Sequence, residues 1–526
     1  MPILSKAAVR KFINRPRDDF SKWRSFTKAD LKRHKKKYLT AKPPIWKKLS
    51  KTQRACLLLG ARFRKFAFFL DTGCGKTLLS IALAKYFRRA EGAQRFLVLV
   101  PNIINTAEWA EEIEKHAPRL KYTILEDATK QKWDDLQDKD CLLYITTYLG
   151  FTRMVCQPAE TRKKKIKFKQ DEKAIRAVVR CVDGIIMDES TLLGNHESSF
   201  HLICKKIAYR LKYAWLLTGT PFGSEPTALW AQMFIIDRGA SIGETLALFR
   251  AAFYREVEQE YSPWPEYIFR ERKAKTVRKL VRHRSLRVEA DQADLPKLVS
   301  IVKPVCMSSD AEAHYSIWKN KMDDVLLDLS RGKLANKQLL GNVFIRMRQI
   351  SSGFIGYDDD ELGERAELLF DDNPKMDQLR SAVQSLRPQN KFVIFCEYVI
   401  SGAQLCKMLS DIGIDHGWIY GKTKDPRAIR KRFYSDPAMQ GLVLNNSCGG
   451  FGLNLQIAQY GFYYETPVDP IMRKQTRRRI ERQRSQHKSV FFWDFPVRGT
   501  YDHRILESLR RGENLFDSIM STHLPD

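Results

Sequence analysis

The sequence contains no apolar stretch long enough to span a bilayer, and the apolar run FAFFL at 66–70 has the length of a buried strand. The first residues, MPILSKAAVRKF, have no long apolar segment, so no secretory signal is expected. Ten cysteines are scattered singly without one C-x-x-C pair, which argues against a zinc site or a disulfide framework. These absences favour reduced thiols in a cytosolic protein that does not enter a membrane.

Acidic residues are few relative to basic ones, with 61 Asp and Glu against 91 Lys and Arg and a formal charge of +30. The excess is clustered in the first fifty residues, in TRKKKIKFK (161–169) and in MRKQTRRRIERQRSQHK (472–488). Clustered positive charge favours a polyanionic partner, and we expect nucleic acid. A basic amphipathic helix of the kind that lies on membrane surfaces is not evident.

The 44% of hydrophobic residues suffice for several cores, and apolar runs alternate with helix-like segments in two stretches. We predict an α/β protein with a basic N-terminal extension (1–43), a first α/β lobe (44–240), a helical insertion (241–365) and a second α/β lobe (366–526). Near-continuous apolar runs that end in polar residues indicate buried parallel strands. The strand candidates are FAFFL, RFLVLVP, CLLYITTY, VDGIIMDES and YAWLLTGTP in the first lobe, and KFVIFCEY, HGWIYG, QGLVLNN, QYGFYYE and SVFFWDF in the second.

Between the lobes, the pattern has a period near that of a helix. LALFRAAFYREVEQEYSPW and AHYSIWKNKMDDVLLDLSRGKLANKQLLGNVFIRMRQI are predicted to be helical. YDDDELGERAELLFDDNP (357–374) is the one sizeable acidic island and is predicted to be a solvent-facing loop.

TGCGKT lies where the first strand candidate meets a helix-like run, and it predicts a phosphate-binding loop. Its glycines let successive N–H groups point at a phosphate, while Lys76 would reach the β/γ-phosphates and the Thr77 hydroxyl would bind Mg²⁺. The full pattern has glycine where Leu70 stands, and a glycine turn with an exposed lysine is the alternative. The predicted nucleotide-binding residues of the loop are Thr72, Gly73, Cys74, Gly75, Lys76 and Thr77.

GIIMDES places two carboxylates at the end of an apolar strand. We expect Asp188 to hold Mg²⁺ and Glu189 to polarise the attacking water, although acids often simply begin loops. LLTGTP (216–221) ends the next strand in polar residues and is, by itself, only a turn.

The C-terminal part carries a glycine-rich SCGGFGLNL (447–455) and then QTRRRIERQRSQ (475–486). Arg479 and Arg482 are three residues apart, so on a helix they would share a face and present two guanidiniums to one triphosphate. Such arginines raise phosphoryl-transfer rates by about 10³–10⁵. The alternative is a helix that binds nucleic acid, to which Arg477, Arg478 and Arg484 would also belong.

Taken in order, these motifs resemble the Swi/Snf-type branch of the superfamily-two helicase-like ATPases over roughly residues 45–490. Three features depart from the family pattern: Thr191 replaces the usual His, Val468 replaces a common Trp, and the last motif ends in RSQ. The residues and segments that carry the resemblance are Gln53, DTGCGKT, VLVPNIINTAEWAEEIEK with Pro101 and Trp109, TTY (146–148), DESTLLGN with Asn195, LTGTP, MRQISSGF (347–354), SCGGFGLNL, and QTRRRIERQRSQ with Gln475, Arg479 and Arg482.

The resemblance implies two RecA-like lobes that hold ATP and Mg²⁺ between them and move along double-stranded DNA without separating its strands. It assigns Gln53 to the adenine, catalysis to Lys76, Asp188 and Glu189, and the arginines with Gln475 to the second lobe. Nucleic-acid contacts are expected at Thr147, Thr220, Ser447 and Gly450.

The expected partner is double-stranded DNA, with forked or branched DNA as a variant. The expected location is cytoplasmic and nucleic-acid-associated, in a bacterium or a virus-infected cell rather than a nucleus. Two other functions stay open: a strand-separating DNA or RNA helicase, and a basic nucleic-acid-binding protein without ATPase activity.

Overall fold

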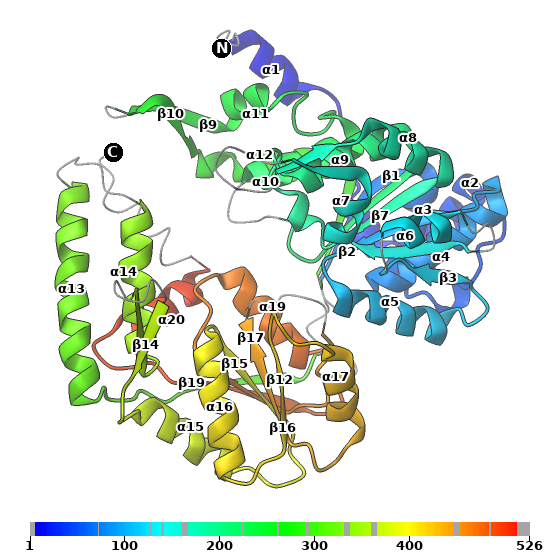
Figure 1. The fold of residues 1–526 in the computed structure, drawn as a ribbon. Coiled ribbons are helices and arrows are strands. Elements are labelled where there is room, and N and C mark those ends of the chain that lie inside the picture. Colours follow the sequence, from blue (N-terminus) through cyan, green and yellow to red (C-terminus); the bar gives the residue numbers. More distant parts are fainter. Residues whose placement is uncertain are drawn as a thin grey trace. The chain divides into compact units, whose positions relative to one another are not determined.

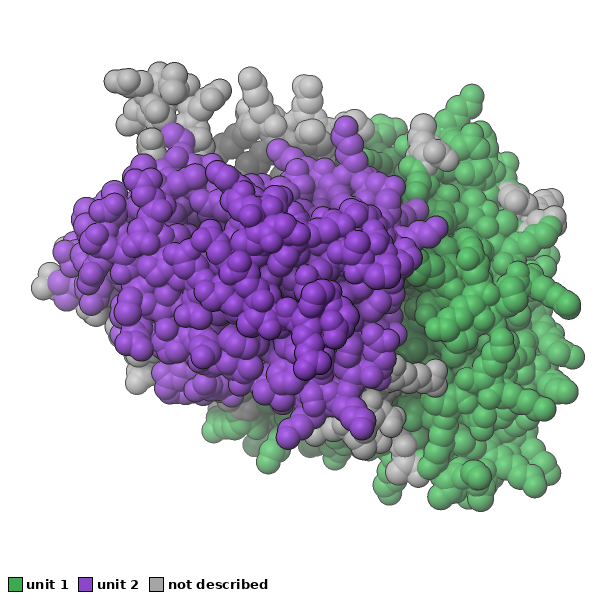
Figure 2. Space-filling view, turned by 90° about the horizontal axis from the view of Figure 1, so that it is seen from below, with its two compact units in different colours: residues 1–291 green, residues 292–526 purple. Residues whose placement is uncertain are grey.

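The computed structural model divides into two compact units, Met1–Asp291 and Gln292–Asp526, which are coloured separately in Figure 2 and described one at a time below. The boundary at Asp291 falls within the stretch 241–365 that lies between the two predicted lobes. The residues that the structure describes are 6–71, 73–126, 129–137, 141–159, 167–221, 226–259, 262–289, 295–330, 337–358, 365–446, 453–482 and 485–512. No helix in these ranges is long and apolar enough to cross a membrane.

Unit 1 is built on a seven-stranded sheet in the order β11-β1-β8-β7-β2-β4-β3, and every pair of neighbours is parallel (Figure 1). Parallel order brings the carboxyl ends of the strands to one edge, where the polar residues after each apolar run meet. In sheet order the strands are Ser285–Val288, Lys65–Leu70, Tyr213–Thr218, Gly184–Asp188, Phe96–Val100, Leu143–Thr147 and Tyr122–Ile124.

Helices cover both faces of this sheet because the side chains of each strand alternate between two apolar cores. In β1, Phe66, Phe68 and Leu70 pack with α3, α4 and α5, whereas Ala67 and Phe69 join the core that α7 to α12 complete. The helices of the unit are α1 Lys6–Asn14, α2 Lys28–Tyr38, α3 Lys51–Phe63, α4 Lys76–Glu91, α5 Ile103–His116, α6 Thr129–Leu136, α7 Tyr148–Val155, α8 Glu172–Cys181, α9 Ser199–Arg210, α10 Pro226–Asp237, α11 Leu246–Phe253 and α12 Ala274–Val281.

The basic N-terminal residues are folded onto unit 1. Phe20, Trp23 and Leu31 are buried in the core under α3 and α4, and Phe12 of α1 packs edge-on against Phe253. A capping box between Thr27 and Asp30 starts α2, whose last turn carries Lys35, Lys36 and Lys37. The extension therefore buries apolar side chains and leaves its lysines on the outside.

Unit 2 repeats the parallel plan with six strands in the order β12-β19-β18-β15-β17-β16. In sheet order the strands are Lys297–Val302, Ser489–Asp494, Tyr460–Tyr463, Phe392–Cys396, Gly441–Asn445 and His416–Ile419. The helices are α13 Ser309–Ser330, α14 Lys337–Ile350, α15 Pro374–Gln384, α16 Val399–Asp411, α17 Pro426–Ser435, α19 Pro470–Ile480 and α20 Tyr501–Arg511. All ten predicted strands are thus present in two parallel sheets, and the predicted α/β fold class is confirmed.

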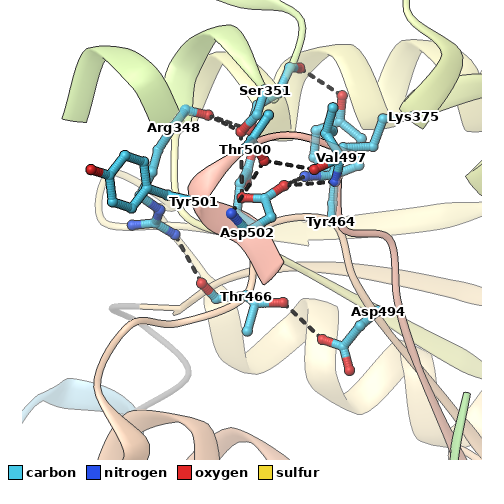
Figure 3. A network of polar contacts seen from close by, with 12 residues as sticks. Arg348, Ser351, Lys375, Tyr464, Thr466, Asp494, Val497, Thr500, Tyr501 and Asp502 are labelled. Atoms are coloured by element: carbon cyan, nitrogen blue, oxygen red, sulfur yellow. Dashed lines mark hydrogen bonds and ion pairs between the residues drawn. The ribbon is translucent and has the colours of Figure 1, made fainter. Parts of the chain in front are cut away.

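A polar network joins three helices of unit 2 (Figure 3). Asp502, at the start of α20, accepts hydrogen bonds from Lys375 Nζ of α15 (3.3 Å), from the N–H of Val497 (3.1 Å) and from the hydroxyl of Ser351 (3.5 Å). Ser351 follows α14, and the Lys375 side chain is only 5% exposed. The buried ion pair therefore holds α15 and α20 together beneath α14.

Parts of the predicted helical insertion are wrong. LALFRAAF forms α11, but the next residues form β9 (Tyr254–Gln259), which pairs with β10 (Ser262–Phe269) in an antiparallel hairpin. In the predicted acidic loop, β13 (Phe354–Asp358) and β14 (Arg365–Leu369) pair instead. A third hairpin, β5 (Cys156–Ala159) with β6 (Lys167–Gln170), flanks residues 160–166, so most of the basic cluster TRKKKIKFK lies outside the described residues.

Candidate functional site

The predicted phosphate loop connects β1 to α4 at the carboxyl edge of the unit 1 sheet. Gly73 and Gly75 both have left-handed backbones, with φ of 88° and 72°, and Gly75 is the N-cap of α4. Such a turn aims backbone N–H groups and the positive end of the helix at the same space, where an anion is stabilised. Lys76 and Thr77 begin the helix, whereas Thr72 lies outside the described residues.

Gln53, in the first turn of α3, forms hydrogen bonds with the backbone of this loop. Its side-chain N–H groups donate to the carbonyls of Cys74 and Gly75, both at 3.2 Å. Its carbonyl oxygen accepts the N–H of Ser50 at 2.8 Å, which completes a capping box at the start of α3. Gln53 is 7% exposed, so it supports the loop backbone in this structure. A role on adenine stays a prediction.

Lys76, after β1, and Glu189, after β7, come together across the end of β8, the strand that lies between β1 and β7. Lys76 Nζ donates to Glu189 Oε1 at 3.1 Å, and the hydroxyl of Thr218, at the end of β8, donates to Glu189 Oε2 at 3.1 Å. Burial opposes the charge on Lys76, yet the carboxylates of Glu189 and Asp188 raise its pKa above the ordinary value. The lysine is therefore charged, and an arriving phosphate would compete with Glu189 for it.

Asp188 ends β7 deep in the same edge. Burial, together with the charge of Glu189, raises the pKa of Asp188, although Lys76 opposes the shift. Asp188 Oδ2 accepts the indole N–H of Trp109 at 2.9 Å and Oδ1 accepts the N–H of Glu189 at 3.0 Å. The hydroxyl of Tyr148 holds the Asp188 carbonyl at 2.9 Å. Glu189 itself has a left-handed backbone, φ 45°, which turns its carboxylate toward Lys76.

Sequence reasoning gave no catalytic role to two residues that the structure places on the acid pair. In the sequence Thr218 belongs to LLTGTP and Trp109 is one of the residues that carry the family resemblance. In the structure each donates a hydrogen bond to one of the two acids. Strand order was the available signal for Thr218, because β8 lies beside β7 and both end in polar residues. Arg287 of β11 connects the ends of β1 and β8, because it donates to Asp71 at 3.4 Å and to the Gly219 carbonyl at 3.1 Å.

The residues predicted to contact nucleic acid lie at several places. Thr147 is the N-cap of α7, and its hydroxyl accepts the N–H of Gly150 at 2.9 Å. Thr220 is half-buried after β8, and its N–H donates to the hydroxyl of Thr218 at 3.1 Å. Ser447 and Gly450 lie outside the described residues. Thr147 and Thr220 thus follow the carboxyl ends of two strands in the sheet that carries Lys76.

The predicted shared helix face for Arg479 and Arg482 is wrong. Helix α19 ends at Ile480, and Arg482 follows the helix, with its Nε donating to the carbonyl of Arg478 at 3.2 Å. Glu481, which is buried, is the C-cap of α19: its N–H donates to the carbonyl of Arg477, and its side chain forms an ion pair with Arg477 at 3.0 Å. Arg479 is 3% exposed and donates to the carbonyl of Leu453 at 3.2 Å, so it ties the helix to the last residues of the glycine-rich stretch 447–455. Gln475 is half-buried within α19.

The donor set in unit 1 suits one small divalent cation with a triphosphate. Among the described residues, no three His, Cys, Asp or Glu side chains gather into a group that could hold a metal alone. Mg²⁺ usually takes one or two carboxylates and completes its shell with waters and substrate phosphates, so Asp188, whose charge acts on Lys76 at the start of α4, fits that pattern. A Cβ placed on Gly73 would meet nothing within 4 Å, which leaves room above the loop.

The model of one protein family, the SNF2-related domain, matches residues 65–352. Protein CHROMATIN REMODELING 5 of Arabidopsis thaliana is 22% identical over 84% of this chain and 25% of its own length. The putative ATP-dependent helicase/translocase YwqA of Bacillus subtilis is 22% identical over 86% of this chain and 46% of its own. The chain therefore spans less than half the length of these curated relatives.

Two solved structures are also similar. The Sulfolobus solfataricus SWI2/SNF2 ATPase core in complex with dsDNA is 19% identical with a TM-score of 0.35, covering 92% of this chain and 94% of that one. The Pyrococcus furiosus Hef helicase domain is 14% identical with a TM-score of 0.45, covering 87% and 97%.

Proposed function

The chain belongs to the SNF2-related family, and on that premise we propose that it hydrolyses ATP to move along double-stranded DNA. The single observation that carries the proposal is the arrangement of Lys76, Glu189 and Thr218 beneath a left-handed glycine turn at a helix N-terminus. A phosphate cradle, a charged lysine and a carboxylate able to orient water are the parts that phosphoryl transfer requires. In the cell we expect the protein to be associated with nucleic acid.

The residues of unit 1 take the following roles in this proposal. N–H groups of Gly73, Gly75, Lys76 and Thr77 hold the phosphates, since the Cys74 N–H donates to the Asp71 carbonyl, and Lys76 leaves Glu189 to neutralise the β/γ-phosphates. Glu189, released from the lysine but still held by Thr218, orients the attacking water. Thr77 and Asp188 would hold Mg²⁺, which neutralises charge on the phosphate oxygens when bound.

For unit 2 we propose a second RecA-like lobe whose arginines act on the same reaction. Arg482, half-buried and beyond the helix, is the candidate to stabilise charge on the phosphoryl oxygens. Arg479, bonded to Leu453, positions α19, and Gln475 is proposed to assist from within it. Thr147, Thr220, Ser447 and Gly450 remain the proposed contacts to the DNA backbone, which position the protein without reading sequence.

ATP hydrolysis, measured side by side with single-stranded, duplex and forked DNA and with RNA, tests the proposal. We expect duplex DNA to stimulate the wild type and Lys76→Ala to abolish turnover, with Lys407→Ala, an exposed lysine of α16, as the control. An absence of wild-type turnover with every nucleic acid would leave only a basic nucleic-acid-binding protein. Unwinding of a plain duplex would instead indicate a strand-separating helicase.

A further inference from the structure

A second concave site lies on unit 1, with a volume of about 440 Å³. Five of its seven lining residues are lysine or arginine, and the other two are leucines whose burial makes an apolar floor. The lining residues are Lys85, Arg88, Arg89, Arg119, Leu120, Lys121 and Leu142.

The topology of the sheet puts this pocket far from the phosphate loop. In a parallel sheet each crossover helix runs back toward the edge where strands begin, so the last turn of α4 lies at the opposite edge from Lys76. There Leu142, just before β4, donates its N–H to the Lys121 carbonyl at 3.0 Å, just before β3. In Figure 1 the labels α4, α5 and β3 lie together. The pocket residues of α4, Lys85 to Arg89, lie about 14–20 Å along the helix axis from Lys76.

In the described ranges, no carboxylate forms an ion pair with Lys85, Arg88, Arg89 or Arg119. Glu91, the acid at the end of the same helix, is occupied elsewhere, by Arg64 at 3.0 Å and by Lys212.

Burial and the neighbouring charges of Lys48 and Arg88 lower the pKa of Lys85. Like charges that share a recess with an apolar floor repel one another more strongly than charges in open water. A bound anion would relieve this repulsion.

The positive charge extends beyond the pocket along one side of the unit. Lys48 Nζ donates to the His116 carbonyl at 2.9 Å, which fixes it at the end of α5 near Lys85. The N–H of Thr40, two residues after α2, donates to the Tyr86 hydroxyl at 3.1 Å. The lysine-rich last turn of α2 therefore leads toward the pocket. A strip of this kind fits a linear polyanion, whereas a compact anion would need only the pocket.

We propose that this amino-terminal edge of the unit 1 sheet is a second binding surface for a nucleic-acid phosphate backbone. The inference rests on the proposed function only in taking duplex DNA as the polyanion. The proposed contacts Thr147 and Thr220 lie at the carboxyl edge, and a duplex with a persistence length of about 150 bp does not bend around one lobe without cost. The two edges therefore hold two DNA segments, and the protein bridges them.

A two-duplex capture assay without nucleotide tests this bridging. One duplex is fixed on beads, the full chain is added, and retention of a second, fluorescent duplex is measured across a range of salt concentrations. The pocket variant removes three exposed cations from the pocket and carries the changes Arg88→Gln/Arg89→Gln/Arg119→Gln. Lys319→Gln/Lys407→Gln/Arg510→Gln removes the same charge from exposed positions of unit 2 and is the matched control.

We expect the wild type and the control to retain the second duplex and the pocket variant to retain it roughly tenfold less or worse. The salt slope of its DNA binding should flatten by about 0.9 for each phosphate that the variant no longer neutralises. An Arg88→Lys/Arg89→Lys/Arg119→Lys variant, which keeps the charge, should retain capture. Thermal unfolding of each variant excludes misfolding as the cause.

Equal capture by the pocket variant and the control would overturn the proposal, as would a wild type that captures no second duplex. Tripolyphosphate binding in calorimetry that the pocket variant loses, without any reduction of capture by tripolyphosphate, would show a site for compact polyphosphates instead. Because capture needs no ATP, its result is independent of ATPase activity. Loss of hydrolysis in every sample would count against the proposed function alone.

Discussion

At the scale of single residues, Glu189 has two partners that pull it in different directions. Thr218 keeps its carboxylate at the strand ends, while Lys76 holds the other oxygen at 3.1 Å. In the proposed mechanism the triphosphate needs the same lysine, so the ion pair would oppose nucleotide binding and would then free the carboxylate for its role in hydrolysis.

Glu189→Gln separates these two effects. The amide keeps the shape but loses the charge, so we expect kcat to fall by about 10²–10⁴-fold. ATP should bind at least as tightly as it does to the wild type, because no carboxylate competes for Lys76. Equilibrium binding of a fluorescent ATP analogue and steady-state hydrolysis measure the two quantities. A variant that loses nucleotide affinity would show that the ion pair supports the empty loop rather than competing with the phosphate.

Glu91 gives a test at low pH. Partial burial opposes its charge, but hydrogen bonds from Lys212, Arg64 and Tyr213 prevail and lower its pKa from 4.5 to about 2. The folded protein therefore favours the ionised form, and this contribution is complete above pH 4.5 and fades as the pH falls toward 2.

We expect Glu91→Gln to lower the free energy of unfolding at pH 7 and to lower it less at pH 3. Urea unfolding at both pH values measures the difference. Glu197→Gln, on an exposed side chain, should show no such change. An equal loss at both pH values would mean that the hydrogen bonds do not depend on the charge of Glu91.

At the scale of elements, the turn between β1 and α4 depends on glycine for two separate reasons. Gly73 and Gly75 both have positive φ, which costs an alanine about 1–2 kcal/mol. A Cβ on Gly75 would in addition lie 2.2 Å from Gln53 Nε2, whereas one on Gly73 meets nothing.

Gly75→Ala should therefore destabilise the protein without nucleotide more than Gly73→Ala does. Gln53→Ala in the Gly75→Ala background should recover part of the loss by removing the steric overlap. Denaturant unfolding of the four proteins measures this. Equal losses for the two glycine variants would show that Gln53 does not pack against the loop as described.

In unit 2, the ion pair of Lys375 and Asp502 between α15 and α20 can be tested by the same kind of unfolding measurement. Lys375→Met leaves Asp502 with two neutral donors but without its buried cation, and losing one partner of such a pair costs about 3–5 kcal/mol. We expect unit 2 to unfold at lower denaturant concentration, with Lys407→Met on the exposed face of α16 as the control. A transition unchanged from the wild type would mean that water replaces the lysine at little cost.

Strands could be predicted from sequence where an apolar run alone determines that the segment is a buried strand. Each of the ten strand candidates is a near-continuous apolar run, and each lies in a parallel sheet. β9 was missed because YREVEQ follows the apolar face of α11 without a glycine or proline, and its pairing with β10 comes from residues further along the chain. The end of α19 was missed because no glycine or proline marks it, although the backbone of Glu481, the C-cap, leaves the helical conformation with ψ of 85°.

The same limit applies to the candidate site. Lys76, Asp188 and Glu189 follow apolar runs that end in polar residues, so their meeting at one sheet edge could be predicted. Trp109 reaches Asp188 from 79 positions away, and Thr218 reaches Glu189 from 29. Neither hydrogen bond could be predicted from a local sequence pattern, because strand order and helix packing bring the two partners together.

At the scale of the whole molecule, the chain combines a family-typical nucleotide site with a charge of +30. Charge alone would account for binding to any polyanion, and the proposed site alone would account for hydrolysis of ATP. Movement along DNA requires that the two are coupled, so that each hydrolysis event shifts the protein relative to the duplex. The proposed function therefore depends most on the coupling of ATP hydrolysis to movement along the duplex.

Displacement of a triplex-forming strand from a blunt duplex tests that coupling most directly. We predict that the wild type releases the third strand with ATP, that Glu189→Gln does not, and that the underlying duplex stays paired. Hydrolysis stimulated by duplex DNA without release of the third strand, or separation of the duplex itself, would contradict the account.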